Sequence, residues 1–301
     1  MPDTSPTGKF VKLGGDGWAM DAHYHELGTG SSYVLFLQTG GAGTSAYMSW
    51  FLNLEPFAAA GYHVFAPDAP NFGLSAVPAG MTVPAPAFTV AFMDALGIPA
   101  AHLVGNSMGS MTSTRVAIDH PDRVKSLILT GGEPRVDTDE TREIAKVLGR
   151  TARMDFVREM LSKPELTVAD VDKATGDFFY DAQHPRVSEV SAMRLEDLRR
   201  PGVQERERAA AFRQIQGGRQ NNAASELATI QAPTCLVHGR DERYFFSAEQ
   251  APVLIKAAVK LSFVVPNASC VLLAHCGHWP QIEKADLFNT LSLAFLSQTG
   301  R

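Results

Sequence analysis

Residues 105–109 carry the clearest chemical signal in the sequence. They read Gly-Asn-Ser-Met-Gly, which matches the pattern G-x-S-x-G. The pattern closes a short apolar run, Ala101–Gly105, and precedes a stretch with helical spacing, so Ser107 falls on a predicted strand-to-helix turn. A serine on such a sharp turn can act as a nucleophile, and the two glycines leave room for the backbone. The alternative is a glycine-rich turn with an inert serine.

A serine nucleophile needs a general base and a carboxylate that orients the base. His278 follows the last predicted strand and is our candidate base, and Asp241 follows the preceding strand and is our candidate acid. Both lie where open α/β sheets place their ligand sites, at the carboxyl ends of parallel strands. The competing base is His275, expected on the strand itself. The competing acids are Glu133, after another strand, and Glu242, expected at the surface.

The negative charge that develops on a reacting carbonyl oxygen needs two preorganised N–H donors. One is expected from the backbone of Met108, the residue after the nucleophile. The other is expected from Gly40, in a glycine-rich loop, residues 39–43, that follows an apolar strand. The alternative for this loop is an ordinary turn.

The elements that must position these residues alternate between strand and helix. Two extended stretches open the chain and six apolar strands follow, at 9–14, 18–27, 33–37, 63–66, 101–105, 124–129, 234–238 and 270–273. This alternation predicts an α/β fold with a mostly parallel eight-stranded sheet and helices on both faces. From 136 to 222 it stops, and Glu, Arg, Lys and Ala recur at helical spacing. We therefore expect a core over 1–135 and 223–301, interrupted by a helical cap, or lid, over 136–222.

The composition excludes several classes of protein. With 301 residues, 45% of them hydrophobic, the chain can bury a large core, and a net charge of −5 gives no footprint for nucleic acid. We expect no membrane segment and no secretory leader, because the sequence has no apolar run of the length or place that either requires. We expect no disulfide framework, because the three cysteines are few and odd in number. No CxxC or HExxH spacing is present. These features predict a cytoplasmic protein that takes a small-molecule substrate and uses no cofactor or metal.

The other histidines are expected to be structural. His23 and His25 share one face of a predicted strand, but no third ligand for a metal is evident in the sequence. His238 is isolated in the sequence and is expected to be structural.

Together these residues resemble the α/β-hydrolase superfamily over nearly the whole chain. More narrowly they resemble the meta-cleavage-product hydrolases, which split carbon–carbon bonds in ring-opened products of aromatic degradation. The stretches that carry the resemblance are Gly40–Gly43, Glu55–Phe57, Ala60–Tyr62, Asn71–Ser75, Gly105–Gly109, Gly239–Asp241, and Cys276–Trp279 with Glu283 and Phe288–Asn289. The resemblance implies a substrate pocket lined by Gly41, Asn106 and Trp279. It also implies that Arg194 of the cap meets the dienoate end of the substrate, and that the protein is a homodimer.

The chain departs from the family pattern on the substrate side of the site, at Gln38–Thr39, Ala42, Ser49 and Ser110. The leading prediction is a cofactor-free hydrolase that cleaves a C–C bond in a vinylogous 1,5-diketone acid, with Ser107 or water as the attacking group. The alternatives are an esterase or lactonase with the same machinery, and a non-catalytic receptor for a small molecule. A basic cap residue in the pocket favours C–C cleavage, because a carbanion or enol leaving group needs stabilisation. The alternative for Arg194 is a solvated helix face.

Overall fold

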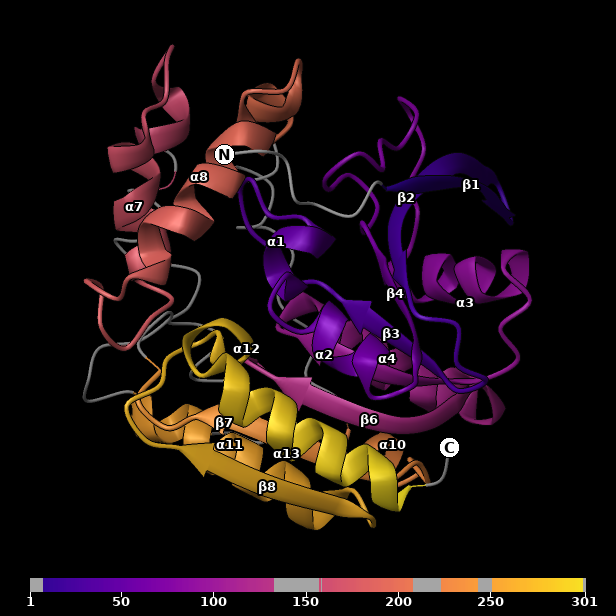
Figure 1. Cartoon of the computed structure of the whole chain (residues 1–301). Coiled ribbons are helices and arrows are strands. Elements are labelled where there is room, and N and C mark those ends of the chain that lie inside the picture. Colours follow the sequence, from indigo (N-terminus) through magenta and orange to yellow (C-terminus); the bar gives the residue numbers. More distant parts are fainter. Residues whose placement is uncertain (1–7, 133–156, 158, 208–222, 243–250, 300–301) are drawn as a thin grey trace.

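The computed structural model describes residues 8–132, 157, 159–207, 223–242 and 251–299 (Figure 1). Its centre is an eight-stranded sheet in the order β1-β2-β4-β3-β5-β6-β7-β8. The strands are β1 (Lys9–Gly15), β2 (Trp18–Leu27), β3 (Tyr33–Leu37), β4 (His63–Pro67), β5 (Ala101–Asn106), β6 (Val124–Thr130), β7 (Thr234–Gly239) and β8 (Ala268–Leu273). The pairs β1–β2 and β2–β4 are antiparallel and the others are parallel. The predicted fold class is confirmed.

Apolar side chains alternate along the central strands and supply two cores, one on each face of the sheet. Leu103 and Leu127 belong to one core, and Val104 and Ile128, their neighbours in sequence, belong to the other. Successive residues of a strand point to opposite faces, so a strand covered on both sides is apolar at every position. Helices α3 (Ala85–Ala95), α4 (Met108–Asp119) and α11 (Ala251–Val264) cover the first face, and α1 (Ala46–Trp50), α2 (Leu54–Ala59) and α13 (Ala285–Gln298) cover the second. The shorter elements are η1 (Pro121–Arg123), α10 (Ala224–Leu227) and α12 (Pro280–Glu283).

The described part of residues 136–222 is helical and contains no strand. Helices α7 (Val168–Gly176) and α8 (Arg186–Leu198) pack side by side, beyond the carboxyl ends of the parallel strands (Figure 1). Their apolar side chains share a core with Ala42, which belongs to the glycine-rich loop after β3. The cap therefore packs directly on residues 39–43, which are expected to stabilise the oxyanion and are called the oxyanion loop below. The boundaries of the cap remain a prediction.

Two further features bear on the sequence analysis. No helix in the described ranges combines the length and the apolar character that a membrane span requires. The three cysteines, Cys235, Cys270 and Cys276, are free thiols.

Candidate active site

Ser107 lies on a strained turn between β5 and α4. Its φ of 54° is positive, a conformation that L residues rarely adopt. Its N–H donates to the carbonyl of Thr130 at 2.8 Å, which ties the turn to the end of β6. A Cβ at Gly105 would lie 2.4 Å from the Gly109 carbonyl oxygen, and a Cβ at Gly109 would lie 2.0 Å from that of Leu37. Only glycine fits at these two positions, as expected for a serine presented on an elbow.

His278 and Ser107 border the same small space above Gly132. A Cβ added to Gly132 would lie 3.6 Å from both the Ser107 Oγ and the Cε1 of His278. The His278 side chain is fully buried, and its Nδ1 faces away from this space, toward a carboxylate. The structure therefore brings the predicted nucleophile and the predicted base together.

The carboxylate that contacts His278 is Glu242, so the prediction of Asp241 for this position is wrong. The Oε1 of Glu242 lies 2.6 Å from the Nδ1 of His278, and the Glu242 side chain is 1% exposed. An ionised carboxylate only accepts hydrogen bonds, so this contact places the ring proton on Nδ1 and leaves Nε2 as the basic nitrogen. The expectation that Glu242 is a surface residue is also wrong.

Asp241 points in a different direction. Its Oδ2 accepts the backbone N–H of His275 at 2.7 Å and lies 3.3 Å from Arg240, and its side chain is 26% exposed. The turn after β7 is held by the Asp241 N–H, which donates to the Cys276 carbonyl. This turn directs Asp241 outward and the next residue inward. His275 is exposed and lies beyond the end of β8, and Glu133 lies outside the described residues.

The backbone of His278 is anchored by the cap and by β5. Its N–H donates to the Phe178 carbonyl at 2.7 Å, and its carbonyl accepts from the Asn106 side-chain amide at 3.2 Å. Asn106 is completely buried and supports the loop that carries His278, residues 274–279, which is called the histidine loop below. The contact of Asn106 with substrate stays a prediction. Glu283 adds a second link, since its carboxylate accepts the N–H groups of Gly277 at 2.6 Å and Tyr180 at 2.9 Å. Burial raises the pKa of Glu283.

The two predicted oxyanion donors lie next to each other. A Cβ at Gly40 would lie 3.4 Å from the Met108 Cβ, so the loop after β3 touches the first residue of α4. Gly41 has a φ of 133°, and its carbonyl accepts the N–H of Thr44 at 3.2 Å, which closes the loop. The backbone of Gly40 and Met108 is thus adjacent to Ser107, as an oxyanion hole requires.

Arg194 is buried between the cap and this loop, so the alternative of a solvated helix face is wrong. Its side chain is 2% exposed, and its Nε and Nη2 donate to the Ala42 carbonyl at 3.1 and 2.9 Å. Its Nη1 donates to the Thr175 hydroxyl at 2.9 Å, and its guanidinium lies 5.6 Å from the Phe178 ring centroid. The contact of Arg194 with the oxyanion loop is a feature that sequence reasoning missed.

Trp279 is also completely buried, and Phe178 from the cap stacks on it. The two ring centroids are 3.9 Å apart with the planes 8° from parallel, and the Phe178 ring lies 5.6 Å from the His278 ring. The indole N–H donates to the Thr39 hydroxyl at 3.4 Å. Trp279 therefore connects the cap, the histidine loop and the loop after β3.

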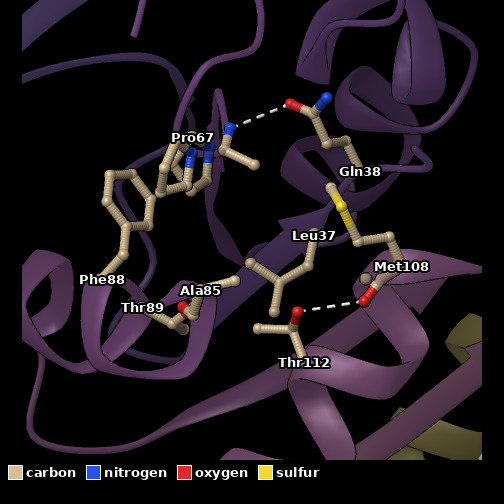
Figure 2. Close-up of a pocket in the computed structure, with 11 residues that line it drawn as sticks. Leu37, Gln38, Pro67, Ala85, Phe88, Thr89, Met108 and Thr112 are labelled. Atoms are coloured by element: carbon tan, nitrogen blue, oxygen red, sulfur yellow. Dashed lines mark hydrogen bonds between the residues drawn. The ribbon is translucent and has the colours of Figure 1, made fainter. Parts of the chain in front are cut away.

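A small cavity lies behind the oxyanion loop (Figure 2). It has a volume of about 20 Å³ and lies among β3, the loop after β4, α3 and the start of α4. The Met108 side chain extends toward Gln38, whose Oε1 accepts the N–H of Ala69 at 3.0 Å (Figure 2). A space of this size holds about one water molecule, so it is not the chamber for an organic substrate.

Comparison with known proteins agrees with this geometry. A profile of the α/β hydrolase fold family matches residues 33–285. The chain is 31% identical over 297 residues to a 2-hydroxy-6-oxononadienedioate/2-hydroxy-6-oxononatrienedioate hydrolase of Burkholderia vietnamiensis, covering 97% of this chain and 96% of that protein. It is 31% identical over 287 residues to a 2-hydroxy-6-oxo-6-phenylhexa-2,4-dienoate hydrolase of Comamonas testosteroni, covering 92% of this chain and 91% of the relative.

Solved structures show the same fold. The meta-cleavage product hydrolase of Pseudomonas fluorescens superposes with a TM-score of 0.79 at 24% identity, over 97% of this chain and 98% of that one. The chain belongs to the α/β hydrolase fold family and is a hydrolase of the meta-cleavage-product hydrolase type. The predicted family and enzyme class are therefore confirmed.

Proposed function

We propose that this protein hydrolyses the C5–C6 bond of a 2-hydroxy-6-oxo-2,4-dienoate, the ring-fission product of an aromatic compound. The observation that carries the proposal is the buried arrangement of Ser107, His278 and Glu242, beside the loop after β3 and the start of α4, from which we expect the oxyanion hole. The names of the relatives support this substrate class. In the reaction, water supplies a hydroxyl to the C6 carbonyl carbon and a proton to C5, which yields a carboxylic acid and a 2-hydroxydienoate.

The roles of the residues follow from their contacts. His278 first assists ketonisation of the dienol and then takes a proton from Ser107 or from the attacking water. Glu242 holds the tautomer of His278 and stabilises the imidazolium that forms. The N–H groups of Gly40 and Met108 donate to the oxyanion on C6.

Arg194 supports C–C cleavage rather than ester hydrolysis. Its buried guanidinium donates to the Ala42 carbonyl and the Thr175 hydroxyl, neutral acceptors that hold the positive charge beside the loop after β3. We propose that its charge attracts the carboxylate and the developing dienolate of the substrate, while Gly41, Asn106 and Trp279 shape the pocket. An ester or lactone substrate has no need of such a charge.

The test compares two substrates with one protein. Purified enzyme is assayed against a 2-hydroxy-6-oxo-dienoate, by loss of its dienolate absorbance and by product analysis, and against p-nitrophenyl acetate. We expect kcat/KM for the dienoate to exceed that for the ester. Ser107→Ala is the matched control and is expected to lower turnover on the dienoate by about 10⁴–10⁶. Turnover of the ester without cleavage of the dienoate would contradict this proposal and favour the esterase alternative.

The protein's location and assembly belong to the same proposal. The three free cysteines fit a reducing cytoplasm. The homodimer is an expectation from the family, and sedimentation of the purified protein tests it.

A further inference from the structure

Glu242 lies between two histidines, and only one of them takes part in the proposed reaction. Its Oε1 contacts His278, whereas its Oε2 lies 3.4 Å from the Nε2 of His238. His238 is on β7, four residues before Glu242, and both side chains are 1% exposed. The sequence analysis interpreted His238 as an isolated structural residue, but the turn after β7 brings it to the catalytic acid.

Titratable side chains from other elements lie near this pair. From the loop after β8, His278 and Cys276 face Glu242, and from α12 Glu283 approaches the same thiol. Burial, and then the charges of Glu283 and Glu242, raise the pKa of Cys276. Asp241 on the same turn points outward, toward the His275 N–H.

A buried carboxylate is costly unless hydrogen bonds or charges stabilise both of its oxygens. The His278 ring stabilises one oxygen of Glu242. The other oxygen lies 3.4 Å from an imidazole nitrogen that carries a proton in the Nε2–H tautomer; the two atoms lack hydrogen-bond geometry, so their attraction is electrostatic. Glutamate has one more rotatable bond than aspartate, so its carboxylate reaches back toward β7 but also has more orientations to lose.

We propose that His238 is a positioning residue for the catalytic acid. The positive edge of its Nε2–H attracts the Oε2 of Glu242 across 3.4 Å, so that Oε1 stays aligned with the Nδ1 of His278. This inference rests on the proposed function of Ser107, His278 and Glu242. His238 does not touch the reacting atoms and acts only through Glu242.

Removal of this donor has two consequences. The Glu242 side chain can rotate away from His278, which lowers kcat without changing substrate contacts. The negative charge on Glu242 is also no longer shared, so it attracts a proton on itself or on His278 more strongly. The first effect takes the carboxylate away from the imidazole and the second strengthens its field there, so they move the acid limb of the kcat/KM profile in opposite directions. A shift to lower pH, by about 0.5–1 unit, is the result that rotation of Glu242 predicts.

The experiment uses a pair of variants. His238→Leu removes the donor and keeps an apolar side chain, whereas His238→Gln places an amide N–H close to the position of Nε2. We expect the leucine variant to lose about tenfold to a hundredfold in kcat, the size of effect seen for outer-shell partners, with KM within about twofold. The glutamine variant is expected to restore most of the kcat and the original pH profile.

A purely structural role gives different results. In that case His238→Leu lowers the melting temperature but leaves kcat and the pH profile unchanged, and the inference is overturned. If the leucine variant does not fold, His238→Asn, whose amide is too short to replace Nε2, is compared with wild type, and the same change is made in a Glu242→Asp background, whose shorter carboxylate cannot reach both histidines. Positioning by residue 238 predicts that His238→Asn lowers kcat when Glu242 is present but lowers it no further in the Glu242→Asp background, and an equal effect in both backgrounds overturns the inference.

Failure of the proposed function is distinguished by a separate pair. Full activity of both Ser107→Ala and Glu242→Gln would remove the proposed function itself. Loss of activity in those two variants, with wild-type behaviour of His238→Leu, would remove only the role of His238.

Discussion

Replacement of Glu242 by Gln tests which of the two acids that follow β7, Asp241 or Glu242, orients the catalytic histidine. The change keeps the shape of a side chain that is 1% exposed, but it removes the negative charge 2.6 Å from His278. Two unit charges with centres about 4 Å apart interact by about 4 kcal/mol at an effective dielectric constant of 20. Since each 1.36 kcal/mol corresponds to a factor of ten in rate, the loss of charge alone predicts a fall of about 10³ in kcat. Loss of the fixed tautomer extends the expected range to about 10⁴.

The matched control is Asp241→Asn. The amide oxygen of asparagine can still accept the His275 N–H, so the turn keeps its hydrogen bond. Side chains that remain partly exposed change stability little, and we expect kcat within about threefold of wild type. Both variants are assayed for dienoate cleavage over a range of pH, and circular dichroism confirms that they are folded. A hundredfold loss in Asp241→Asn with an active Glu242→Gln would refute the assignment of the acid.

Three further predictions concern the elbow, the cap and the pH dependence of stability. Gly109→Ala places a Cβ 2.0 Å from the Leu37 carbonyl oxygen and should lower the free energy of unfolding by about 3 kcal/mol in urea denaturation. Arg194→Met removes the charge and the contact with the Ala42 carbonyl, so kcat/KM should fall about a hundredfold for the dienoate but only about tenfold for a neutral ester. Burial raises the pKa of Asp197 from 3.8 to about 6, so its contribution to stability is present below pH 4 and is lost as the pH rises through 6. Asp197→Asn should therefore match wild type near pH 4 and exceed it by about 2 kcal/mol above pH 7 in thermal unfolding.

Each of these predictions has a contrary result. Wild-type stability of Gly109→Ala would mean that the elbow can relax. Equal losses on both substrates would limit Arg194 to holding the oxyanion loop. A stability difference between Asp197→Asn and wild type that does not vary with pH would contradict the raised pKa.

The sheet could be predicted from the sequence because its strands are short, apolar and bounded by glycine. The elbow could be predicted for a related reason, since the motif itself shows both glycines: Gly105 is required by its contact with Gly109, although Gly109 is required by a contact with Leu37 on β3. These features depend on local chemistry that the residue types display directly.

The acid could not be predicted in the same way. Asp241 and Glu242 are adjacent carboxylates after the same strand, and which of them points inward depends on a turn held by the Cys276 carbonyl, 35 residues later in the chain. The buried position of Arg194 has the same cause, because its acceptor on Ala42 belongs to a distant loop. Amphipathic spacing shows which face of a helix is apolar, but it does not show which residues of the rest of the chain pack against that face.

The hydrogen bond from the His278 N–H to the Phe178 carbonyl has a consequence for enzyme engineering. A Cβ at Gly277 would also lie 2.4 Å from that same carbonyl oxygen, so the cap backbone and the histidine loop are fitted to each other. Exchange of the whole cap between related enzymes would replace part of the support of the catalytic histidine. A chimera that seeks a new substrate range should retain residues 178–180 from the parent that supplies the core, and should recombine only the helices on either side.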